Sequence, residues 1–94
     1  MKVYVLRYCY ARHGEDFTRA VHMTHKGALL DQCELLLEVL LDMEWEEEDV
    51  KEMDYINSII EKDDPITVDE LIQHANVLER YAEYVEVYTE VEAF

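Results

Sequence analysis

Residues 84–94 read Tyr-Val-Glu-Val-Tyr-Thr-Glu-Val-Glu-Ala-Phe, and the fold predicted for the chain depends on where this segment pairs. Valine, threonine or alanine occupies every second position, and tyrosine or glutamate occupies most positions between them. Successive side chains of a strand point to opposite faces of a sheet, so this alternation is typical of a strand with one buried and one wet face. The backbone of such a strand needs hydrogen-bonding partners, which must come from earlier in the chain.

Two further strands are predicted near the N-terminus. Residues 3–10 are rich in β-branched and aromatic side chains, and residues 17–23 form a second such segment. Residues 12–16 between them contain Gly14, which can adopt a positive φ and favours a hairpin turn. The second strand is expected to place four side chains on one side: Phe17, Arg19, Val21 and Met23.

The last strand must pair with one of these two, and pairing with the first keeps both chain termini in one sheet. The tyrosines of the first strand are expected to share a face with those of the last. The uncovered face of the sheet would then carry a set of tyrosines suited to partner contact: Tyr4, Tyr8, Tyr10, Tyr84 and Tyr88.

Three helices are predicted between the hairpin and the last strand. The first follows Thr24 as its N-cap and repeats apolar side chains at spacings of three and four: Leu29, Cys33, Leu36, Leu37, Leu40 and Leu41. The second follows a break at residues 45–49 and is ended by residues 63–65. The third begins with a capping box of Thr67 and Glu70. The order ββαααβ predicts a single α+β domain over residues 1–94: a three-stranded antiparallel sheet with helices packed on one face.

The charge of the chain is strongly uneven. Eight basic and 23 acidic residues give −15, whereas residues 1–30 carry five basic and two acidic side chains, a net charge of +3, so residues 31–94 carry −18. Half of the residues are hydrophobic and follow helix and strand periods, which indicates a folded domain with an acidic surface. Such a surface repels nucleic acid and anionic membranes and attracts basic surfaces.

The acid is densest in residues 42–54, where eight carboxylates accompany Lys51 alone. If this run is helical, it spans about 20 Å with one charge every ~2.4 Å, close to the ~1.7 Å per charge of duplex DNA. Two interpretations stay open: a polyanion-like docking surface, or a solvated face that keeps the protein soluble. On the first, the acidic and aromatic side chains of this run and of the last strand are predicted to bind a partner: Asp42, Glu44, Trp45, Glu46, Glu47, Glu48, Asp49, Glu52, Asp54, Tyr55, Tyr84, Glu86, Tyr88, Glu90 and Glu92.

Residues 12–15 read Arg-His-Gly-Glu and resemble the signature of the histidine acid phosphatase and phosphoglycerate mutase superfamily. The resemblance implies His13 as a phosphorylated nucleophile and Arg12 as a phosphate clamp. Those enzymes continue from the motif into a helix within a much larger α/β domain, whereas a strand is predicted here. We therefore interpret the motif as a hairpin turn and predict that the protein is not an enzyme.

Metal and cofactor sites are not predicted. His22 and His25 flank a strand–helix junction, and the chain contains no Cys-x-x-Cys or His-x-x-x-His pair. The acidic run lacks the residue order of a calcium loop, and two glycines cannot form a Gly-rich phosphate loop. Cys9 and Cys33 are expected to be reduced thiols, which together with the absence of a signal peptide or apolar span favours a soluble cytoplasmic protein.

The opening of the chain, Tyr-x-Tyr-x-Arg-His-Gly-x-Asp over residues 8–16, looks like that of small uncharacterised bacterial and phage proteins, over about the first third of the chain. In size and acidity the whole chain is similar to phage-encoded anti-defence proteins, especially anti-CRISPR proteins and DNA mimics. This likeness implies an inhibitor in the cytoplasm of an infected bacterium, bound to the basic nucleic-acid-handling surface of a CRISPR effector or other defence complex. The alternative is a small homodimeric interaction module that associates through its sheet, with the acid serving solubility.

Overall fold

The sheet begins with a hairpin of β1 (Tyr4–Tyr10) and β2 (Glu15–His22) in the computed structural model, which describes residues 2–62 and 65–94. The connection is a short 3-10 helix, η1 (Ala11–His13), closed by Gly14 at φ 65°. Glycine suits this position because an L side chain rarely adopts a positive φ. The hairpin interpretation of Arg-His-Gly-Glu is confirmed at the backbone, while the side chain of His13 lies outside the described part of the structure.

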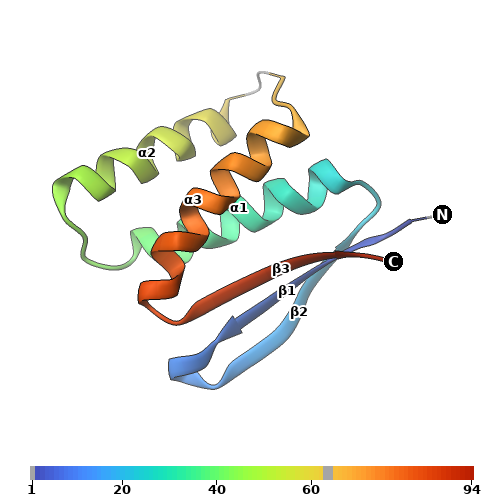
Figure 1. Cartoon of the computed structure of the whole chain (residues 1–94), viewed down its shortest axis with the longest axis horizontal. Coiled ribbons are helices and arrows are strands. Elements are labelled where there is room, and N and C mark those ends of the chain that lie inside the picture. Colours follow the sequence, from blue (N-terminus) through green and yellow to red (C-terminus); the bar gives the residue numbers. More distant parts are fainter. Residues whose placement is uncertain (1, 63–64) are drawn as a thin grey trace.

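Strand β3 (Val87–Ala93) pairs antiparallel with β1, so the sheet order is β2-β1-β3. Both the pairing and the ββαααβ order are confirmed (Figure 1). The alternation is confirmed as well, since Val87 is 1% exposed and its neighbour Tyr88 is 50% exposed. The strand starts later than predicted because α3 (Val68–Tyr84) continues through Tyr84. The chain then turns into β3 through Glu86, a non-glycine residue with φ 58°.

Helices α1 (His25–Leu41), α2 (Glu47–Glu61) and α3 all lie on one face of the sheet, as predicted (Figure 1). Helices α1 and α3 rest on the strands, and α2 packs against α1 at the greatest distance from the sheet. The predicted apolar stripes meet in one core, whose largest fully buried side chains include Leu6, Leu36, Leu40, Met53, Leu71 and Leu78. Helix α2 ends at Glu61, and the predicted stop at Asp63 and Asp64 lies outside the described residues.

The predicted tyrosine-rich open face is wrong. Tyr8 is only 5% exposed, and Tyr4 and Tyr10 share its helix-covered face because they are four and two residues from it on the same strand. Tyr84 belongs to α3, so only Tyr88 of the predicted set lies on the uncovered face. Both faces of β1 contain apolar side chains, but the other set includes Arg7, whose charge is costly to bury. The tyrosine set therefore faces the core.

A β-bulge in β2 corrects a second expectation. Leu6 pairs with Ala20 and Arg7 pairs with Thr18, which leaves Arg19 as the extra residue. As a result Phe17 lies beside Tyr8 on the helix side, with ring centroids 5.0 Å apart, while Val21 lies on the uncovered face. The predicted common side of Phe17, Arg19 and Val21 is therefore wrong.

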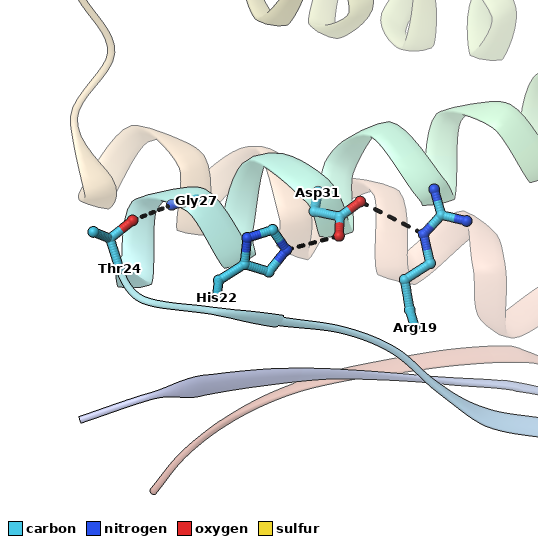
Figure 2. Close-up of polar contacts among 5 residues, drawn as sticks. All are labelled: Arg19, His22, Thr24, Gly27 and Asp31. Atoms are coloured by element: carbon cyan, nitrogen blue, oxygen red, sulfur yellow. Dashed lines mark hydrogen bonds and ion pairs between the residues drawn. The ribbon is translucent and has the colours of Figure 1, made fainter. Parts of the chain in front are cut away.

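The displaced Arg19 ties β2 to α1 (Figure 2). Its Nε lies 3.5 Å from Oδ1 of Asp31, and His22 Nε2 lies 2.8 Å from Oδ2 of the same carboxylate. Two side chains from the end of β2 thus contact the carboxylate of one aspartate on α1. These contacts fix the angle at which the chain passes from the hairpin into the first helix.

The first turn of α1 leaves no room for a side chain at Gly27. The Gly27 N–H donates to Thr24 Oγ at 3.0 Å, which confirms the predicted N-cap (Figure 2). A Cβ at Gly27 would lie 2.9 Å from Thr24 Oγ1 and 3.4 Å from His22 Nδ1. Gly27→Ala is therefore expected to destabilise the protein by about 1 kcal/mol through loss of the cap, although alanine favours helices elsewhere. Thermal unfolding measures the effect.

The matched background for this test is Thr24→Ala, which removes both the cap and the obstructing hydroxyl. In that background Gly27→Ala should cost much less, or stabilise the helix by its higher propensity. An unchanged cost in the two backgrounds would show that the close contact with Thr24 is not the cause.

A buried polar network links three elements under the sheet. Gln32 of α1 is 3% exposed, and its Nε2 donates to Glu79 Oε1 of α3 at 2.7 Å and to Thr89 Oγ1 of β3 at 3.0 Å. Burial raises the pKa of the Glu79 carboxyl, and the hydrogen bond from Gln32 opposes that rise. The network satisfies Gln32 but leaves a partly desolvated carboxylate in the folded state at neutral pH.

We expect Glu79 to contribute a specific pH dependence of stability. Because its folded-state pKa lies above the ordinary glutamate value, its favourable contribution is present at acidic pH and is lost as pH rises through the folded-state pKa. Glu79→Gln should therefore gain stability relative to wild type as pH rises toward neutral. Urea denaturation over a pH series measures the difference. Exposed Glu38→Gln is the control, and equal pH slopes in the two variants would contradict the expectation.

Candidate functional site: the acidic corner

Residues 42–54, here called the acidic corner, do not form the single helical row that their charge density suggested. Helix α1 ends at Leu41 with Asp42 as its C-cap, and α2 begins only at Glu47. The break therefore lies slightly before the predicted residues 45–49. Because the chain turns here, the carboxylates surround a corner between two helices, and the DNA-like linear spacing does not apply to the run as a whole.

Trp45 anchors the acidic corner to the core. Its Nε1–H donates to the Leu40 carbonyl at 2.7 Å, and its ring meets that of Tyr81 edge-on, with centroids 5.4 Å apart and an interplanar angle of 76°. In the second turn of α2, Met53 is fully buried. The corner is thus held on one side by the contacts of Trp45 and on the other by a buried apolar side chain.

Tyr81 is the residue that the sequence did not assign to this site. Its hydroxyl lies 2.6 Å from Glu52 Oε1 and 3.2 Å from Asp49 Oδ1, so α3 is connected to the first turns of α2. The hydrogen bond to Glu52, followed by burial, raises the Tyr81 pKa, and the hydroxyl stays a donor. An aromatic residue with a polar tip on an otherwise apolar helical stripe was the available signal.

Most of the acid in the corner is not neutralised by the protein. Glu47, Glu48 and Asp49 occupy the first turn of α2, where they offset the positive end of the helix dipole. Lys51 pairs with Glu47 at 3.5 Å, with both side chains largely exposed. Asp49 and Glu52 contact Tyr81. Across residues 2–62 and 65–94, the other five carboxylates of the corner form no ion pair: Asp42, Glu44, Glu46, Glu48 and Asp54.

The predicted partner-binding residues divide between separate surfaces. Tyr84, at the end of α3, lines the same hollow as Trp45 and so joins the acidic corner, and Tyr55 is 64% exposed on α2. Glu86 pairs with Arg12 at 3.6 Å in the turn beside the hairpin. The remaining members of the predicted set lie on the uncovered sheet face: Tyr88, Glu90 and Glu92.

The uncovered sheet face has mixed charge. Glu90 is the cross-strand neighbour of Arg7, and Asp16 is the neighbour of Cys9. These four residues and Tyr88 line a hollow of about 240 Å³. Arg7 thus offsets part of the acid of this face, and the two surfaces are distinct candidates for partner contact.

Both cysteines are free, as predicted. Burial raises the pKa of the Cys33 thiol to about 12, and its Sγ lies 3.9 Å from the Leu71 carbonyl oxygen. A thiol with so high a pKa is a poor nucleophile at neutral pH. Cys33 is therefore a packing residue.

The described residues contain no group of three or more His, Cys, Asp or Glu side chains positioned to hold a metal ion. His22, at the strand–helix junction, contacts Asp31 instead. No helix in the part of the chain that the structure describes is long and apolar enough to cross a membrane.

Comparisons with protein-family models, with curated proteins and with solved structures find no match to this chain. The acidic corner is therefore interpreted from its own chemistry.

Proposed function

We propose that the protein docks through its acidic corner on a basic, nucleic-acid-handling surface of another protein. The observation that carries this proposal is the group of five exposed carboxylates without an ion pair in the described chain, on the corner that Trp45 anchors. Protein surfaces that bind nucleic acid cluster lysine and arginine to neutralise phosphates. The acidic corner presents the opposite charge to such a surface.

Rigidity distinguishes this corner from a solvated charged face. Carboxylates that serve solubility need only be exposed, whereas the backbone that carries these is held by the Trp45–Leu40 hydrogen bond, by Tyr81 and by buried Met53. Like charges held close together repel one another and destabilise the compact state. A preorganised surface loses less conformational entropy on binding, which favours a docking role.

The partner class is a bacterial defence complex such as a CRISPR effector, in keeping with the likeness in size and acidity to phage anti-defence proteins. In that setting the protein acts as an inhibitor that occupies the nucleic-acid site, without contacting nucleic acid or membrane itself. No catalytic step belongs to the proposal. Recognition would combine long-range attraction with contact by aromatic side chains near Trp45.

A pull-down from bacterial lysate tests the proposal. Tagged protein should retain a nucleic-acid-binding partner at about 0.1 M salt and release it at about 1 M, where the Debye length falls from ~10 Å to ~3 Å. Added random-sequence DNA should release the same partner. A partner held equally at both salt concentrations would contradict docking by the acidic corner.

A second candidate function is self-association through the uncovered sheet face. Val21 is 60% exposed on that face, and the terminal Phe94 is 64% exposed, so apolar area is available there. Light scattering separates the two candidates: a stable dimer whose mass changes neither with salt nor on adding basic partners would favour a homodimeric interaction module.

A further inference from the structure

A hollow beside the acidic corner combines aromatic walls with negative charge. It has a volume of about 360 Å³ and lies where α1 and α3 end and α2 begins. We call it the Trp45 hollow and define it by its acidic and aromatic lining side chains: Glu44, Trp45, Asp49, Tyr81 and Tyr84.

The aromatic rings of the hollow are fixed in different planes. Trp45 and Tyr81 are held edge to face, and the hydrogen bond from Trp45 to Leu40 keeps the indole from rotating. Tyr84 is 79% exposed at the rim. A planar ring offers a negative face that attracts a cation lying over it. The arrangement therefore has aromatic surface available to a ligand without rearranging the core.

Two independent sources make the electrostatic potential in the hollow negative. Glu44 has no ion pair in the described chain, and Asp49 contributes a second carboxylate. Helices α1 and α3 also end here, and no basic residue in the last turn of either helix offsets the negative end of its dipole. The opposing positive end of α2 is offset by its own acidic first turn.

We propose that the Trp45 hollow receives an arginine side chain of the basic partner. This proposal rests on the docking function above and names the group that is recognised. A guanidinium is planar, stacks on aromatic faces and forms bidentate hydrogen bonds with a carboxylate, whereas the lysine ammonium is a compact point charge. The hollow therefore selects arginine over lysine, and the surrounding carboxylates attract both.

Trp45 is the single tryptophan of the chain, so its fluorescence reports this site directly. The probes are a hexa-arginine peptide and a hexa-lysine peptide, titrated at about 0.15 M salt. Hexa-arginine should give a saturable fluorescence change with severalfold higher affinity than hexa-lysine. Tyr84→Ala and Glu44→Gln should each weaken hexa-arginine binding by about two- to fivefold and reduce the preference for arginine.

Matched controls are Tyr55→Ala, an exposed tyrosine on α2 outside the hollow, and Glu48→Gln, an exposed carboxylate that does not line it. Both should keep the arginine preference. Equal binding of the two peptides, or a Tyr84→Ala variant with unchanged preference, would overturn the arginine site while leaving salt-sensitive docking by the corner intact. If neither peptide binds at this salt concentration, both proposals fail. Thermal unfolding verifies that each variant is folded.

Discussion

Replacing Glu46, Glu47 and Glu48 together by glutamine is expected to weaken binding to the basic partner about ten- to hundredfold without unfolding the protein. All three side chains are exposed, and exposed charge pairs contribute roughly 0.5–1 kcal/mol each. The fold should persist because the substitutions relieve repulsion among like charges while removing only a modest helix-dipole contribution. Titration calorimetry with the captured partner measures the affinity, and circular dichroism measures the helix content.

A second triple variant controls for net charge. This variant removes an equal number of charges from the uncovered sheet face by three substitutions: Asp16→Asn, Glu90→Gln and Glu92→Gln. Binding should change little in this variant. Equal weakening by the two variants would assign the effect to net charge alone, and full binding by the corner variant would make the acidic run a solvated surface.

Leu40→Ala is expected to lower the free energy of unfolding by about 2–5 kcal/mol, because it leaves a cavity in the core. Leu40 is fully buried, whereas its neighbour Leu41 is 38% exposed. Leu41→Ala should therefore cost less than about 1 kcal/mol, although both leucines belong to the apolar stripe that the sequence indicates. Urea denaturation followed by Trp45 fluorescence measures both variants.

This pair tests where the core boundary lies on α1, and the helix propensities of the two substitutions are the same. A similar loss of stability for Leu40→Ala and Leu41→Ala would contradict the packing of α1 against the sheet and α2.

Local chemistry explains why much of the fold is predictable from the sequence. The caps at Thr24 and Thr67, the positive φ at Gly14 and the alternation in β3 each depend on residues within a few positions of one another. The face of β1 is less determined, because both sets of alternating side chains include apolar residues. The bulge at Arg19 is not visible in the sequence, since it depends on how β2 meets β1 and α1.

In the candidate site, too, local features are predictable and contacts between distant segments are not. The carboxylates of the acidic corner are predictable as surface residues, because so many charges cannot be buried. Tyr81 is separated from Asp49 by 32 positions, and their contact exists only because α3 packs beside the start of α2. Charge alone groups Glu90 and Glu92 with the corner, but the sheet places them on a different surface.

Competition with nucleic acid is the most direct test of docking on a nucleic-acid-handling surface. The partner captured at low salt is incubated with the protein and with increasing amounts of random-sequence duplex DNA, and the bound protein is measured. Displacement by DNA, with an affinity that falls steeply as salt rises, is the predicted result. Binding that is indifferent to both DNA and salt would contradict the proposal.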